Sequence, residues 1–186
     1  MKLKKLNAVL ALLSTICLLA HMGYSAFTYA TMYYNPVLTK VFSIPCMVFI
    51  CLHAVLGMSI VFVQQDGTRL DLYPKQNRET LLQRISAALI FPLLIMHINT
   101  FSYIMQNVQA GKPGVVVLLI IVNVLFYGIV LTHVAVSFSK ALITLGWLSS
   151  REKKKTIDIV VYILCAVIFV VLLLTIVRGQ VKMFLQ

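Results

Sequence analysis

Four histidines are the residues of this chain whose type and spacing are best suited to chemistry, because an imidazole can hold a metal ion or move a proton. The sequence contains only His21, His53, His97 and His133. Each lies within a different apolar stretch, and none lies in a polar connection. A polar side chain inside a long apolar stretch is costly and usually has a partner or a function. A hydrogen bond between helices would explain any one of them alone, whereas the set of four indicates a ligand site.

The composition indicates which elements carry these histidines. Of the 186 residues, 61% are apolar and 11% are charged, against about 45–50% and 25% in soluble globular proteins. A membrane-spanning helix needs about 20 apolar residues in a row. We therefore expect one all-α domain over residues 1–186, an integral membrane bundle of five transmembrane helices. The expected spans are residues 6–30, 41–63, 85–105, 115–139 and 157–177.

The basic residues indicate the orientation of the bundle. Lys and Arg number 16 and Asp and Glu number 5, so the formal net charge is +11. Most basic residues precede the first span or lie in the connections after the second and fourth spans; those of the opposite side are Lys40, Lys112, Arg178 and Lys182. Positive loops stay in the cytoplasm, which predicts a cytoplasmic N-terminus. Because the charges flank apolar runs, the expected partner is membrane lipid and no nucleic acid.

Two segments have alternative interpretations. Residues 1–27 also resemble a secretory signal, but the apolar run continues to about residue 30, so we expect it to be retained as a span. The longest connection, residues 64–84, is expected to form turns rather than a continuous helix. Its turn-favouring residues are Asp66, Gly67, Asp71, Pro74 and Asn77.

The depth of each histidine in its span sorts the four into two pairs. Counted from the predicted cytoplasmic ends, His21 lies about 22 Å and His97 about 18 Å along its helix, at a rise of about 1.5 Å per residue. His53 lies about 15 Å and His133 about 9 Å along by the same rise. We therefore expect an outer pair, His21 with His97, and an inner pair, His53 with His133.

Two imidazoles that face each other across a helix bundle can supply both axial ligands of a haem iron. Such an iron has no open position for oxygen or substrate, which suits electron transfer. Zinc is disfavoured, because it commonly recruits carboxylates and all five acidic residues lie in predicted cytoplasmic loops or at an inner helix end. The same distribution disfavours a proton relay. The histidines thus predict two b-type haems, one for each pair.

Further residues near the expected ligands have two interpretations each. Lys140 lies seven residues after the fourth histidine, on nearly the same helix face, and together with Arg84 it would pair with propionates of the inner haem. As an alternative, Lys140 is an interfacial cation whose stem lies along apolar surface. The glycines Gly23, Gly57 and Gly128 would let a flat ring approach the backbone, or would serve ordinary helix packing.

The ordered set of motifs resembles the single-polypeptide, di-haem cytochrome b anchor of succinate dehydrogenases and fumarate reductases. One histidine lies on each of the first four of five spans. The third span opens with Gln83-Arg84-Ile85-Ser86-Ala87, which is similar to the family's Gln-Arg-Ile-Ser/Thr-Gly motif ahead of its haem histidine. The fourth span, from Tyr127-Gly128 through His133 to Lys140, is similar to the family's fourth helix. Two departures are Ala87 in place of Gly and Leu131 in place of a Glu that some members carry.

The resemblance implies a membrane anchor of a succinate:quinone oxidoreductase or a quinol:fumarate reductase in the bacterial cytoplasmic membrane. A flavoprotein subunit with FAD and an iron-sulfur subunit would dock on the cytoplasmic face. Electrons would pass between the iron-sulfur clusters and a quinone, menaquinone by resemblance, and this chain would perform no dicarboxylate chemistry. Four polar groups could contact the quinone, although a hydrogen bond between helices is the expected role of each: Ser86, Asn99, Asn123 and Tyr127.

Two alternatives remain open from the sequence. The chain could be the cytochrome b subunit of another quinone-linked dehydrogenase, although such subunits generally draw several ligands from fewer helices. It could also be a haem-free membrane scaffold or assembly protein whose histidines are hydrogen-bonded between helices.

Overall fold

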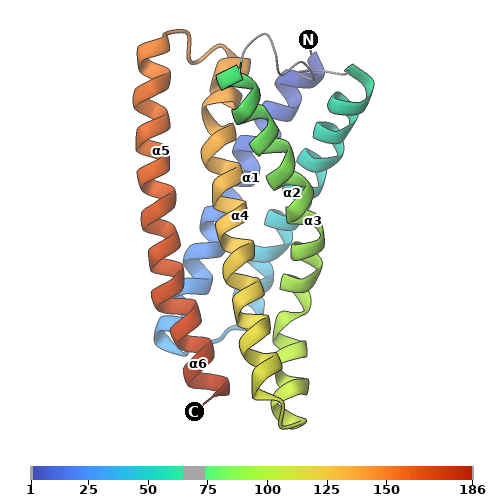
Figure 1. Cartoon of the computed structure of the whole chain (residues 1–186), viewed down its shortest axis with the longest axis vertical. Coiled ribbons are helices and arrows are strands. Elements are labelled where there is room, and N and C mark those ends of the chain that lie inside the picture. The colour runs from blue at the N-terminus through green and yellow to red at the C-terminus, as the bar shows by residue number, and fades with distance from the viewer. Residues whose placement is uncertain (1, 65–73, 186) are drawn as a thin grey trace.

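The computed structural model describes residues 2–64 and 74–185, and these residues form long helices joined by short connections (Figure 1). No strand occurs in the described ranges. The last helix continues through one π-helical turn, η1, into a short terminal helix, α6. The elements are α1 Lys2–Thr31, α2 Pro36–Gln64, α3 Pro74–Gln109, α4 Pro113–Leu145, α5 Arg151–Leu172, η1 Leu173–Val177 and α6 Arg178–Phe184.

Five helices are long and apolar enough to cross a membrane, the fifth being the run from α5 through α6. The all-α class and the five apolar helices predicted from the sequence are therefore confirmed. Each helix extends beyond its apolar run, because polar residues at the ends continue the same backbone hydrogen bonding. The fourth helix, for example, continues past the expected residue 139 to Leu145 and ends at Gly146. Gly146 adopts φ 83°, a left-handed conformation that glycine accepts without strain.

The expectation that the connection at residues 64–84 forms turns is wrong for the second half of that connection. α3 begins at Pro74, so that residues 74–84 are helical. Proline is favoured in the first turn of a helix, because its missing N–H has no partner there in any case. The turn-favouring residues Asp66, Gly67 and Asp71 lie outside the described residues.

The helices run alternately up and down, and α4 lies at the centre of the bundle (Figure 1). We call the end where α1 begins the N-terminal end and the opposite end the C-terminal end. α4 packs against α1, α3 and α5, and it contributes more buried residues than any other described helix. α2 packs closely on α1, and neither α3 nor α4 packs closely against it. Close packing of α2 is therefore with α1, and close packing of α3 is mainly with α4.

Candidate functional site: two histidine pairs across the bundle

The four histidines lie as two pairs in the interior of the bundle. The ring centroids of His21 and His97 are 6.4 Å apart, with ring planes at 88°. The centroids of His53 and His133 are also 6.4 Å apart, with ring planes at 59°. All four side chains are half-buried. These are the same two groupings that depth along the helices predicted.

Each pair joins helices that do not pack closely on each other. His21 of α1 faces His97 of α3, and His53 of α2 faces His133 of α4. The close helix contacts of the described chain are instead α1 with α2, α3 with α4, α4 with α5 and α1 with α4. The imidazoles therefore reach across the bundle diagonally, where side chains rather than helix backbones approach each other.

The separation of the rings in both pairs is compatible with one metal ion held between two imidazoles. A metal–nitrogen bond is about 2 Å long and a ring nitrogen lies about 1 Å from its ring centre, so two imidazoles that share one ion would have centroids up to about 6 Å apart. Both pairs have this separation, 6.4 Å. Among residues 2–64 and 74–185, no three or more His, Cys, Asp or Glu side chains converge on one point. The donor set suits a two-ligand axial site better than a zinc site with three or four protein ligands.

Asparagine side chains hold one histidine of each pair. His53 Nδ1 lies 2.9 Å from Asn7 Oδ1 of α1, and His97 Nδ1 lies 3.1 Å from Asn123 Oδ1 of α4. An amide oxygen can only accept, so Nδ1 donates its proton in both cases. The other ring nitrogen, Nε2, then carries the lone pair that a metal would use. Metal-binding histidines are commonly oriented by such a hydrogen bond from the second nitrogen.

His133 is oriented by the start of α3. Its Nδ1 lies 3.1 Å from the Gln83 carbonyl oxygen and 3.1 Å from Ser86 Oγ. The Ser86 hydroxyl donates to the same carbonyl at 3.0 Å, so Oγ is free to accept from the imidazole. His133 therefore also donates from Nδ1 and keeps Nε2 for a ligand.

His21 differs from the other three histidines. Its Nδ1 is buried and has no hydrogen-bond partner among the described residues. Its immediate aromatic neighbour is His97, which also stacks on Phe126 at 4.7 Å and meets Tyr127 edge-on at 5.9 Å. The outer pair thus has one imidazole fixed by a hydrogen bond and one positioned by packing alone.

The two cations expected at the inner site lie near the His53–His133 pair along α3 and α4. Lys140 Nζ donates to Thr80 Oγ1 at 3.2 Å and to Gln83 Oε1 at 3.1 Å. Because the Gln83 carbonyl accepts from His133, Gln83 links the Lys140 ammonium to the histidine. Arg84 follows Gln83 on α3 and is half-buried. Their pairing with haem propionates stays a prediction.

Three of the four polar groups considered as quinone contacts, Ser86, Asn99 and Asn123, make hydrogen bonds within the bundle. The Ser86 hydroxyl accepts a hydrogen bond from His133, and the Asn123 amide oxygen accepts one from His97. Asn99 Nδ2 donates to the Ile95 carbonyl of its own helix at 2.8 Å. The bonds of Ser86 and Asn123 join two helices, as expected from the sequence, whereas the bond of Asn99 stays within α3.

The glycines divide between the two interpretations given above. A Cβ added at Gly128 would lie 3.6 Å from the Phe169 ring of α5, so this glycine lies in a helix contact away from the histidines. A Cβ at Gly57 would lie 3.9 Å from the Asn7 amide, which is the partner of His53. Gly57 therefore lies beside the inner pair, and its position leaves room there.

Asn7 and Thr100 are part of this site and were missed by the sequence analysis. Asn7 orients His53, and Thr100 Oγ1 accepts from Asn123 Nδ2 at 3.0 Å. The sequence does indicate that Asn7 has a hydrogen-bond partner, since this residue lies at the start of an apolar stretch, where an unpaired amide is unfavourable. The position of Asn7 in the sequence does not identify its hydrogen-bond partner, because the rotation of each helix decides which helix faces meet.

No family model matches the sequence, and neither a curated protein nor a solved structure shows significant similarity to it. The resemblance to cytochrome b anchors therefore stays a prediction from the sequence.

Proposed function

We propose that the chain is the di-haem cytochrome b membrane anchor of a succinate:quinone oxidoreductase or quinol:fumarate reductase. The observation that carries the proposal is the presence of two histidine pairs, each with its ring centroids 6.4 Å apart. His21 and His97 would hold the outer haem, and His53 and His133 the inner haem. Three of the four rings donate from Nδ1, which leaves Nε2 for a metal ion, as is common in metal-binding histidines.

The residues of this chain would hold and insulate two redox groups. When bound, b-type haems would supply one-electron carriers. Asn7, Asn123 and the Gln83 carbonyl fix the ring orientations by the hydrogen bonds described above. Arg84 and Lys140 place positive charge beside the inner pair, where propionates would need counter-ions.

The proposed orientation places the N-terminal end of the bundle in the bacterial cytoplasm. The excess of Lys and Arg in the segments at that end supports it. A flavoprotein subunit carrying FAD and an iron-sulfur subunit would dock there. Electrons would pass between their clusters and membrane quinone, with menaquinone as the favoured type. Dicarboxylate chemistry would belong to the flavoprotein alone.

The test is a haem count by pyridine haemochrome spectrum on the purified membrane complex, with each histidine replaced by alanine in turn. We expect two b haems per chain in the unaltered protein. His21→Ala and His97→Ala should each remove the same haem, and His53→Ala and His133→Ala should each remove the other. A preparation without haem, or one whose haem content is insensitive to all four changes, would overturn the proposal.

The partner assignment has its own test. In a strain that lacks this chain, succinate dehydrogenase or fumarate reductase activity should move from the membrane fraction to the soluble fraction. The complemented strain should restore membrane attachment. Unchanged distribution of both activities would contradict the assignment to this complex while leaving the haem sites standing.

A haem-free membrane scaffold is the second candidate, and one observation favours it. The hydrogen bonds of His53, His97 and His133 each tie two helices together, which is what a scaffold would need. A colourless but stable preparation would support the scaffold. In that case the alanine variants should lower the unfolding temperature without any spectral change.

A further inference from the structure

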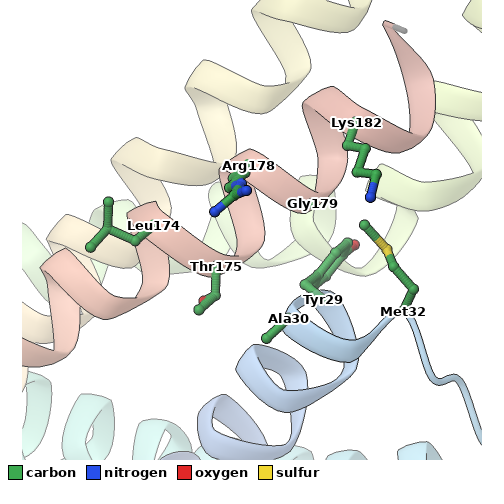
Figure 2. Close-up of a pocket in the computed structure, with 8 residues that line it drawn as sticks. All are labelled: Tyr29, Ala30, Met32, Leu174, Thr175, Arg178, Gly179 and Lys182. Carbon is green, nitrogen blue, oxygen red and sulfur yellow. The ribbon is translucent and has the colours of Figure 1, made fainter.

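A pocket lies at the C-terminal end of the bundle, between the end of α1 and the last helical turns of the chain. Its volume is about 230 Å³. Figure 2 shows Tyr29 and Met32 on one wall and Thr175, Arg178 and Lys182 on the other. The π-helical turn η1 stands directly before Arg178, and such turns recur at functional sites.

The pocket carries two positive charges without acidic partners. Arg178 and Lys182 are four residues apart, which places them one turn apart on the same helix face. In Figure 2 the Lys182 side chain extends toward Tyr29 and Met32. Neither cation forms an ion pair with a described carboxylate, and the ion pairs of the described residues involve Glu79 and Asp158 near the N-terminal end. A ligand for this pocket is therefore an anion.

Tyr29 supplies a neutral donor at the same place. Gln180, which is 3% exposed, donates from Nε2 to Tyr29 Oη at 3.4 Å. Because the Tyr29 oxygen accepts this hydrogen bond, the hydroxyl hydrogen remains able to donate to an acceptor in the pocket. Gly179 allows the arrangement, because a Cβ there would lie 2.8 Å from Tyr29 Cδ1. The tyrosine ring packs directly on the backbone of the cationic helix.

Apolar side chains border the charged part of the pocket. Leu174, 66% exposed, and Met32, 42% exposed, both line it. The helices around it are apolar enough to cross a membrane. The ligand must therefore combine an anionic head with an apolar body. We propose that this pocket binds the phosphodiester headgroup of an anionic phospholipid, with Arg178, Lys182 and the Tyr29 hydroxyl as its donors.

The experiment measures lipid retention by native mass spectrometry of the detergent-solubilised chain. Phosphatidylglycerol and phosphatidylcholine with identical acyl chains are offered at equal concentration. We expect a preference for phosphatidylglycerol of about 25-fold, since each of the two cations near an anionic headgroup contributes on the order of a fivefold gain. The double variant Arg178→Gln/Lys182→Gln should lose that preference. Equal retention of the two lipids by the unaltered chain would overturn the proposal.

Two further variants make the result specific. Lys40→Gln/Lys112→Gln removes two exposed cations from the same end of the bundle but none from the pocket, and it should keep the full preference. Tyr29→Phe removes only the hydroxyl and should lower the preference several-fold, which also decides the matter if the double variant does not fold. If the Lys40→Gln/Lys112→Gln control lost the preference for phosphatidylglycerol to the same extent, the preference would depend on the overall positive charge of this end of the bundle. That result would overturn the assignment of the pocket.

A soluble competitor distinguishes the source of the phosphate. Excess glycerol 3-phosphate should leave lipid retention unchanged if the acyl chains contribute to binding. Displacement of phosphatidylglycerol at millimolar glycerol 3-phosphate would reassign the pocket to a soluble anion. None of these measurements depends on haem, so they stand apart from the test of the proposed function.

Discussion

Asn123 lies between His97 and Thr100 and fixes the orientation of the histidine ring. Its Oδ1 is 3.1 Å from His97 Nδ1, and its Nδ2 is 3.0 Å from Thr100 Oγ1. Asn123 is 2% exposed, so water does not compete for either bond. Because the hydroxyl of Thr100 accepts from the amide nitrogen, the amide oxygen must face His97. Three side chains on two helices thus determine which imidazole nitrogen is left for a ligand.

On the proposed function, Asn123→Leu should raise the reduction potential of the proposed outer haem. A hydrogen bond from Nδ1 makes the imidazole a stronger donor and stabilises the ferric state, and its removal withdraws that stabilisation. One hydrogen bond of about 1 kcal/mol corresponds to roughly 40 mV for a one-electron couple. Spectropotentiometric titration of both haems measures the shift, and the inner haem should not change.

The matched control for this prediction is Asn99→Leu. Asn99 lies two residues from His97 on α3, but among the described residues its amide bonds only to the Ile95 carbonyl. Its replacement should leave both potentials within experimental error. An equal shift in the two variants would show that the Asn123 hydrogen bond does not tune the haem.

Asn7→Leu should act on the inner haem instead. Asn7 Oδ1 accepts from His53 Nδ1 at 2.9 Å, and no other partner of that nitrogen occurs among the described residues. We expect a potential shift of the same sign and similar size, about 40 mV upward, confined to the inner haem. If the Asn7 and Asn123 variants shifted the potential of the same haem, this result would contradict the assignment of the histidine pairs.

Ser86→Ala should have a smaller effect than Asn7→Leu. His133 Nδ1 has two acceptors at 3.1 Å, the Ser86 hydroxyl and the Gln83 carbonyl. Loss of the hydroxyl leaves the carbonyl in place, so the ring keeps its orientation and its proton. A shift below about 20 mV is expected in the same titration, half of the value for a single lost bond. A full-sized shift would mean that the carbonyl bond is not maintained.

Gly179→Ala should destabilise the chain. The added methyl group would lie 2.8 Å from Tyr29 Cδ1 and 3.0 Å from Tyr29 Cβ, so α1 and the terminal helix must separate. Overpacking of this kind costs about 1–3 kcal/mol. Thermal unfolding in detergent, followed by circular dichroism, measures the loss. Gly23→Ala is the control, because nothing lies within 4 Å of its added Cβ, and it should be neutral or slightly stabilising.

The sequence by itself determined the five apolar helices and the depth of each histidine. Both follow from local physics, since a lipid-soluble helix must satisfy its own backbone and its rise per residue is constant. The grouping of His21 with His97 and of His53 with His133 needs only those depths. The sequence misled at residues 74–84, where isolated turn-favouring residues were given more weight than the ability of Pro74 to begin a helix.

Only the tertiary structure decided how each helix is rotated and which faces meet. Asn7 reaches His53 on the next helix, and Gly128 meets Phe169 of α5 rather than the histidines. The pocket of Tyr29 and Lys182 joins residues from opposite ends of the chain. Such contacts depend on the packing of all the helices together. Periodicity within one apolar helix carries little information about rotation, because nearly every face of these helices is apolar.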